Sequence, residues 1–107
     1  MQKYILTLIL VFATNFAIAW DGTNRAKVSK LDIAPGGDPR TVRVYLEGSL
    51  KLCGNDFTWA YIGENTAGYD AVVSALLAAR VSQKPITIYA NQNPDDHNYC
   101  YIGYVSF

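Results

Sequence analysis

Residues that commonly carry chemistry are sparse in this chain of 107 residues, which has one histidine and two cysteines. His97 follows Asp95 and Asp96, and consecutive residues in a turn do not converge on one point as a metal site or a general base requires. No motif that would supply a serine or cysteine nucleophile accompanies them, and no pair of carboxylates has a spacing that suggests acid–base work. We therefore expect a solvated loop around His97, no metal, no cofactor and no catalytic activity.

The two cysteines, Cys53 and Cys100, are the remaining candidates for chemistry. In an oxidising compartment, an even pair of cysteines in a small domain typically forms a disulfide. A metal pair or two free thiols are the alternatives, although two cysteines without a nearby histidine cluster make a poor zinc site. A bridge between these positions would contribute roughly 4 kcal/mol by the chain-entropy model.

The first residues of the chain indicate the compartment. Lys3 supplies a positive charge, an apolar run follows as far as Phe12, and the segment ends in Ala17-Ile18-Ala19. This is the pattern of a cleavable signal peptide, and the apolar run is shorter than the roughly 20 residues that span a membrane. We predict a signal peptide over residues 1–19, one mature domain over residues 20–107, no membrane span, and a bacterial product that is secreted or periplasmic.

The charge balance excludes one class of partner. Nine Lys and Arg residues balance nine Asp and Glu residues in the full chain, and removal of Lys3 leaves a slightly acidic domain without a basic run. Nucleic acid binding depends on clustered cations that neutralise phosphates. We therefore expect no nucleic acid partner.

Hydrophobic periodicity predicts five strands. The clearest is the segment in which Val42, Val44 and Leu46 alternate with more polar residues, as a half-buried strand requires. Gly103 is a candidate β-bulge in the last strand. The other strands are expected over residues 26–34, 57–62, 86–89 and 99–107.

A change of period predicts one helix between the third and fourth strands. Apolar residues from Tyr69 to Leu77 recur at helical spacing, which indicates a helix over 67–81 with Asn65 or Thr66 as its cap. The resulting order, β-β-β-α-β-β, is that of the OB-fold. We predict a β-rich α+β domain that closes into a five-stranded OB-fold barrel.

The helix face opposite this apolar stripe carries small uncharged residues, where a solvent-facing helix usually carries Lys and Glu. Alanine is also the best helix former, which is the simpler explanation. The hypothesis we retain is a closed homo-oligomer assembled through this helix. Its interface residues would be Ala71, Ser74, Ala75 and Ala78.

Aromatic content is high, with eight tyrosines and two tryptophans. In a regular last strand, Tyr99 and Tyr101 would share one face and Tyr104 would lie on the other. The tyrosines could fill a small core with their hydroxyls at its rim, or they could form a recognition surface for sugars or for a protein.

Three segments carry a resemblance to a known family: Trp20-Asp21-Gly22, the early strand that contains Ser29, and the run from Ser82 to Tyr89. Together they resemble the B subunits of AB5 toxins, of the kind found in subtilase cytotoxin and typhoid toxin. The resemblance implies an OB-fold that assembles as a homo-pentamer, binds sialylated cell-surface glycans and partners a catalytic A subunit. It also implies that Ser29 corresponds to the glycan-contacting serine of that family.

The function we predict is an exported, non-catalytic binding module that recognises a glycan. By analogy and composition, its ligand-binding candidates are Ser29, Trp59 and Tyr89. A periplasmic inhibitor or accessory subunit that docks a protein partner without sugar binding is the alternative, and a small hydrolase is the third hypothesis.

Overall fold

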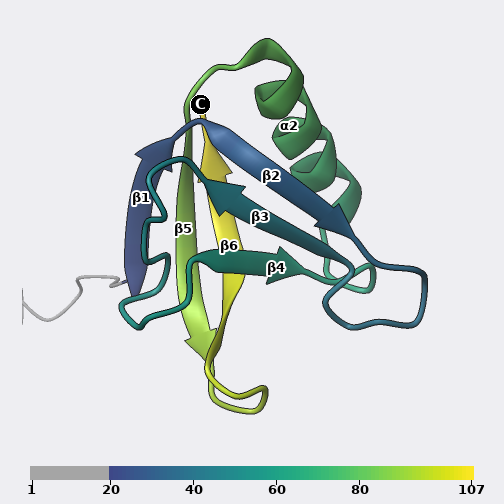
Figure 1. Cartoon of the computed structure of the whole chain (residues 1–107). Coiled ribbons are helices and arrows are strands. Elements are labelled where there is room, and N and C mark those ends of the chain that lie inside the picture. The colour runs from purple at the N-terminus through teal and green to yellow at the C-terminus, as the bar shows by residue number, and fades with distance from the viewer. Residues whose placement is uncertain (1–19) are drawn as a thin grey trace, which may run out of the picture.

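The computed structural model describes residues 20–107, so the predicted signal peptide over 1–19 lies outside the described residues. Six strands and one helix make up this part of the chain (Figure 1). The helix α2 (Tyr69–Ser82) separates the fourth strand from the fifth. The strands are β1 (Gly22–Ala26), β2 (Val28–Ile33), β3 (Val42–Leu46), β4 (Trp59–Ile62), β5 (Ile86–Asn93) and β6 (Tyr99–Ser106).

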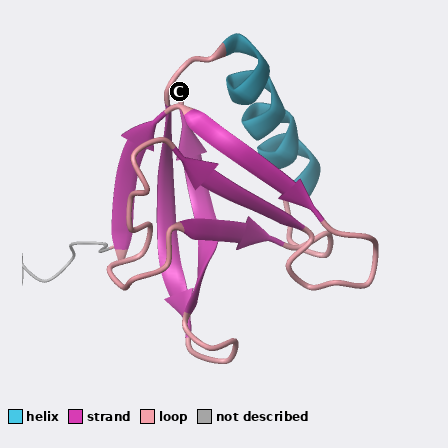
Figure 2. Ribbon diagram, in the orientation of Figure 1, coloured by secondary structure: helices cyan, strands magenta, loops and turns pink. Residues whose placement is uncertain are grey.

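All six strands belong to one mixed sheet (Figure 2). Their order in it is β1-β5-β6-β4-β3-β2, with the labels of Figure 1. Neighbouring strands are antiparallel except for β4 and β6, which are parallel. The prediction of a β-rich domain with one helix is confirmed for the described residues. The closed five-stranded barrel is not confirmed, because there are six strands and the two edge strands, β1 and β2, do not pair with each other.

The N-terminal strand prediction over 26–34 is wrong in its extent. The structure has two strands there, interrupted at Lys27, and they lie at opposite edges of the sheet. The sequence of β1 lacks an apolar alternation, so its strand conformation comes from antiparallel pairing with β5, as between Thr23 and Tyr89. A strand that owes its existence to a distant partner leaves little local signal.

The predictions for the other strands differ from the structure mainly at their ends. β3 is the strand predicted from the alternation that begins at Val42. β4 begins at Trp59 rather than Phe57, and β5 continues past Tyr89 to Asn93. This extension is polar, and it is held in the sheet because Asn91 and Asn93 pair with β6.

An aliphatic core lies on the inward face of the sheet. Alternate residues of the paired strands are almost completely buried, and a fully buried Val, Leu or Ile contributes about 1.5–3 kcal/mol of transfer free energy. α2 lies beside β2 and closes this side of the core (Figure 1). The core side chains include Val28, Val42, Val44, Leu46, Leu52, Ile62, Leu76, Ile86, Ile88 and Ile102.

The predicted disulfide between Cys53 and Cys100 is confirmed, with a Cα–Cα distance of 5.5 Å. Both cysteines are completely buried. The bridge ties β6 to the long connection between β3 and β4. That connection also packs against β1, where the side-chain amide of Asn24 donates to the carbonyl of Lys51 at 3.0 Å.

α2 begins at Tyr69 and ends at Ser82, close to the predicted bounds of 67–81. The predicted cap is wrong: Gly68 occupies the N-cap position at φ 80°, and neither Asn65 nor Thr66 caps the helix with its side chain. Glycine adopts this left-handed conformation without the steric cost that a Cβ would bring. The helix therefore starts from a tight turn rather than from a capping hydrogen bond.

The buried face of α2 largely follows the predicted stripe, since Tyr69, Val72 and Val73 pack against the core, and only Leu77 departs from it. Leu76 and Ala79 are completely buried, whereas Leu77 is 43% exposed and Val81 is 84% exposed. The helix packs beside an edge strand, so only a narrow side of it is covered. Of the proposed interface residues, Ala71, Ser74 and Ala78 are exposed and Ala75 is half-buried. Within residues 20–107, no helix has the length and apolar character that a membrane crossing requires.

Candidate ligand-binding site

The outward face of the sheet is aromatic where the inward face is aliphatic. Residues directly opposite each other on paired strands share a face. Tyr61 on β4 lies opposite Tyr101 on β6, and Tyr89 on β5 lies opposite Tyr104 on β6. The residues on either side of Tyr61, Tyr89 and Tyr101 along their strands are buried in the core. We call this outward surface of β4, β5 and β6 the aromatic face.

A bulge at Gly103 brings Tyr104 onto this face. The pairing of β5 with β6 shifts between Tyr89 and Ala90, so that Gly103 is left without an opposite residue. The predicted bulge is thus confirmed. Tyr104, however, lies on the same side as Tyr101, not on the opposite side as a regular strand would place it, because an extra residue reverses the alternation.

One group of rings covers this bulge. The ring of Trp20 lies 5.7 Å from that of Tyr89, and the ring of Tyr89 lies 5.2 Å from that of Tyr104. A Cβ added to Gly103 would overlap the Trp20 ring, so the bulge requires glycine for this close approach. We call Trp20, Tyr89 and Tyr104 the Trp20 cluster.

A second group of rings includes Tyr99, the residue that precedes the disulfide-bonded Cys100 on β6. The ring of Tyr99 is 4.9 Å from the ring of Phe57 and 4.9 Å from the ring of Trp59. Two guanidinium groups lie over these rings, that of Arg43 at 5.3 Å from the Trp59 ring and that of Arg40 at 5.3 Å from the Tyr99 ring. Cations in this position are attracted by the electron-rich ring face. The Trp59 cluster consists of Phe57, Trp59, Tyr61 and Tyr99.

Arg40 connects this cluster to the turn between β5 and β6. Its Nη1 donates to both carboxylate oxygens of Asp96, at 2.8 and 3.0 Å. Burial by itself would raise the pKa of Asp96, but the hydrogen bonds from Arg40 and His97 outweigh it and lower the pKa below its ordinary value. The hydrogen bond to Asp96 likewise raises the pKa of Arg40. The ion pair therefore holds the turn against the sheet at neutral pH.

Tyr61 on β4 also contacts the residues that lead into this turn. Its hydroxyl accepts a hydrogen bond of 2.8 Å from the side-chain amide of Asn93, and burial raises the pKa of that hydroxyl despite this bond. Asn93 in turn accepts a hydrogen bond of 3.1 Å from the backbone of Asp95. The conformation of the turn is thus set by side chains from β4 and from the loop before β3.

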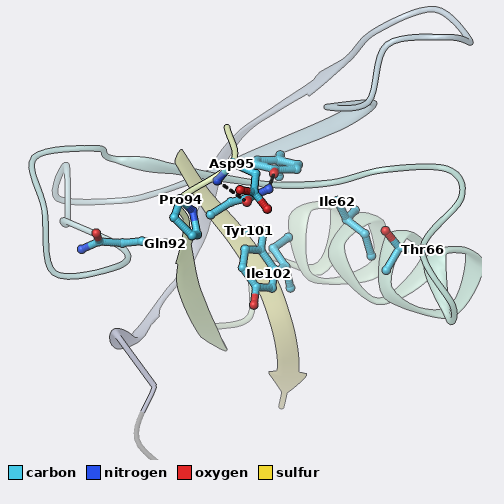
Figure 3. A pocket seen from close by; sticks show the side chains of 9 residues that line it. Ile62, Thr66, Gln92, Pro94, Asp95, Tyr101 and Ile102 are labelled. Atoms are coloured by element: carbon cyan, nitrogen blue, oxygen red, sulfur yellow. Dashed lines mark hydrogen bonds between the residues drawn. The ribbon is translucent and has the colours of Figure 1, made fainter. Parts of the chain in front are cut away.

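A pocket of about 490 Å³ lies between this turn and the end of β4. In Figure 3, Pro94 and Asp95 stand on one side of Tyr101 and Ile102, while Ile62 and Thr66 stand on the other. Tyr101 is 37% exposed and presents part of its ring to solvent. The full lining is Tyr61, Ile62, Thr66, Gln92, Asn93, Pro94, Asp95, Tyr101 and Ile102.

The structure does not bring the three predicted ligand-binding residues together into one cluster. Trp59 is half-buried within the Trp59 cluster, and Tyr89 is half-buried within the Trp20 cluster. Ser29 lies on the edge strand β2, where its hydroxyl donates to the carbonyl of Tyr45 at 3.1 Å. None of the three lines the pocket. Their roles in binding remain predictions.

His97 is in an exposed turn, as expected. Its side chain is 78% exposed, and its Nδ1 lies 3.4 Å from Asp96 Oδ1, which is itself held by Arg40. In the described part of the chain, no three side chains of the metal-ligating types gather where they could hold an ion.

The pocket residues that sequence reasoning missed are Thr66, Asn93, Asp95 and Tyr101 in particular. Tyr101 carried a partial signal, because its alternation with two buried residues of β6 placed it outward. Asn93 and Asp95 carried no such signal. A polar segment in a sequence is interpreted as a solvated loop unless the residues that hold it in place are known. This chain matches no protein-family model, and neither a curated protein nor a solved structure matches it.

Proposed function

We propose that this chain is an exported, non-catalytic binding module that recognises a glycan at the pocket beside the Trp59 cluster. The single observation that carries the proposal is the composition of that pocket: an exposed tyrosine ring, Tyr101, among hydroxyl, amide and carboxylate groups. A sugar presents an apolar C–H surface and a rim of hydroxyls. An aromatic ring with a few fixed polar groups around it is the matching surface.

The rigidity of the pocket supports the same proposal. Asn93 is held by Tyr61, and the turn that carries it is tied by Asp96 to Arg40. A site that is ordered before binding loses less conformational entropy when a ligand arrives. This matters for sugars, because each hydroxyl contributes little net free energy after it has been desolvated.

We propose further that the fold is an OB-fold. Lys27 alone separates β1 from β2, so the two can be counted as one bent strand that reaches both edges of the sheet. The OB-fold is a partly open five-stranded barrel that binds ligands on the face of its second and third strands and at two adjoining loops. On this count those strands are β3 and β4, and the loops are the one that holds Arg40 and the β5–β6 turn. The proposed OB-fold is the fold that the AB5 B-subunit resemblance implies.

The experiment is glycan binding by residues 20–107 produced with the disulfide intact. Tyr101→Ala should weaken binding of a glycan identified on an array by about five- to tenfold, the value of one aromatic contact. Tyr104→Ala is the matched control, because Tyr104 is an exposed ring on the same strand that does not line the pocket. Absence of binding to any glycan at high protein concentration, or equal losses in both variants, would count against the proposal.

A second candidate function is assembly through α2, either into a homo-oligomer such as a pentamer or with an A subunit or another protein partner. The observation that favours it is the exposure of Leu77 and Val81 beside the small residues of the same helix. Exposed apolar side chains that gather on one surface often mark a protein interface. Val81→Glu should reduce the mass of such an assembly in solution to that of a monomer, whereas a wild-type protein that is already monomeric would exclude a homo-oligomer.

A further inference from the structure

The pocket continues into two neighbouring hollows. One hollow, of about 330 Å³, is lined by Gly37 and Glu64 among others, and another, of about 390 Å³, by Glu64 and Asp70 among others. Thr66 lines all three cavities, so they adjoin one another at this residue. The combined surface is longer than the pocket alone, and it can accommodate an extended ligand.

The charge along this surface has one sign. Asp95 lines the pocket, and Asp38, Glu64 and Asp70 line the two hollows. No Lys, Arg or His among the described residues lines any of the three cavities. An anionic ligand would therefore be repelled by Asp95, Glu64 and Asp70 along this surface.

Of these four carboxylates, Asp38 has a cationic partner among the described residues, whereas Asp95, Glu64 and Asp70 have none. Arg40 binds Asp96 through both carboxylate oxygens, and Arg43 lies 3.7 Å from Asp38 and over the Trp59 ring. Asp95, in contrast, makes no side-chain hydrogen bond or ion pair with another described residue. Its carboxylate is exposed at the rim of the pocket. It is the charged group there that is free to meet a ligand.

We infer that the glycan taken by this site carries free amino groups, as 2-amino-2-deoxy sugars do, and that acidic sugars are excluded, including the sialylated glycans that the AB5 resemblance implies. This inference rests on the proposed function of the pocket. The ring of Tyr101 would contact the apolar face of the sugar, and the carboxylate of Asp95 would pair with its ammonium group. Glu64 and Asp70 would meet further amino sugars of the same chain at the adjoining hollows.

The experiment compares three tetrasaccharides at mildly acidic pH and low salt, by calorimetry with residues 20–107. The glucosamine tetramer is positively charged, the N-acetylglucosamine tetramer is neutral, and the galacturonic acid tetramer is negatively charged. The glucosamine tetramer should bind most tightly and the galacturonic acid tetramer least. In Asp95→Asn, affinity for the glucosamine tetramer should fall by about two- to fivefold while that for the N-acetylated tetramer is unchanged.

Asp56→Asn is the matched control, since this carboxylate is 96% exposed and pairs with Lys51 outside all three cavities. It should leave all three affinities unchanged. Equal or tighter binding of the acidic tetramer, or an unchanged ranking in Asp95→Asn, would overturn the charge preference and leave glycan binding intact. Failure of all three tetramers to bind, together with a blank glycan array, would overturn the proposed function itself.

Discussion

The Trp20 cluster and the Trp59 cluster occupy the same outward face of the sheet but are held together by different forces. The Trp20 cluster consists of rings packed on one another and on the bulge at Gly103. The Trp59 cluster includes Tyr99, which precedes the disulfide-bonded Cys100, and two guanidinium groups lie over its rings, one of them bound to Asp96. Ring packing dominates in the first cluster, whereas a disulfide and an ion pair restrain the segments next to the second.

This difference indicates which end of the face is suited to binding. The Trp20 cluster anchors the beginning of the described chain, with Asp21 accepting a hydrogen bond of 2.8 Å from the backbone of Gln92. The Trp59 cluster positions a turn whose side chains line a pocket. A ligand site needs side chains that are held in a fixed geometry, so disulfides and ion pairs are expected near it.

Of the changes that test the difference between the two clusters, removal of the disulfide should have the largest effect on stability. The bridge spans a sequence separation of 47 residues, for which the chain-entropy model gives about 4 kcal/mol. The Cys53→Ala/Cys100→Ala double variant should lose roughly that much free energy of unfolding, measured by urea titration. Because Trp20 and Trp59 are the two tryptophans of the chain, Trp20→Phe and Trp59→Phe backgrounds report on each cluster by fluorescence.

Reduction of the wild-type protein is the control for the double variant, and it should lower the urea midpoint to the same extent. Both tryptophan reporters should shift together, because a domain of this size unfolds cooperatively. A loss below about 1 kcal/mol would show that the bridge is not what restrains the Trp59 cluster.

A substitution at the Gly103 bulge should have an intermediate effect on stability, and the structural change should be confined to the Trp20 cluster. In Gly103→Ala the new methyl group overlaps the Trp20 ring, and such overpacking costs about 1–3 kcal/mol. The fluorescence of Trp20 should shift to longer wavelength as the ring is displaced, while that of Trp59 stays constant.

Gly36→Ala provides the matched control for this substitution. A Cβ at Gly36 would come no closer than 3.7 Å to its nearest neighbour, a carboxylate oxygen of Glu64. Its effect on stability should stay within about 0.5 kcal/mol. Addition of Trp20→Ala to Gly103→Ala should remove the penalty of the bulge substitution, and a penalty that persisted would mean that Trp20 is not its cause.

Loss of the ion pair should have the smallest effect, and this effect should depend on pH. Asp96→Asn should cost about 1 kcal/mol near pH 6, because a partly exposed ion pair is screened by solvent. The folded-state pKa of Asp96 is lowered, so its contribution is complete above the ordinary value of 3.8 and is lost as the pH falls through the lowered value. Wild type and variant should therefore become equally stable once the pH lies below the lowered pKa.

Lys51→Gln is the control for the pH series, because its ion pair with Asp56 is fully on the surface. It should change stability little at either pH. A difference between wild type and Asp96→Asn that did not shrink on acidification would mean that the variant acts through packing and not through charge.

Much of the fold could be predicted where the signal was local. The alternation at Val42, Val44 and Leu46 gave the correct strand, and a lone glycine in the last strand marked the correct bulge. The helix was predicted within two residues at its start and one at its end. β1 and the polar half of β5 were missed, because only pairing with distant strands makes those segments extended.

The candidate site was less accessible to prediction than the fold. Trp59 was recognised by its residue type, but whether its ring lies beside a pocket depends on Arg40 and Asp96, which are 56 positions apart in the chain. Ser29 was assigned by resemblance, and its hydroxyl is engaged with the backbone of a neighbouring strand. Residue type can nominate an aromatic side chain, but it does not tell which others will gather around it.

By itself, the sequence determined the period of each apolar segment, the pair of cysteines available for a disulfide, and the position of Gly103 at the bulge. These properties follow from short-range chemistry, because side-chain alternation and backbone freedom belong to single residues and their neighbours. Only the tertiary structure decided that Tyr104 joins Tyr101 on the aromatic face, that Leu77 and Val81 remain exposed, and that the Asp95 carboxylate has no partner among residues 20–107. Each of these depends on strand register, helix rotation or long-range pairing, which are set by packing between segments far apart in the chain.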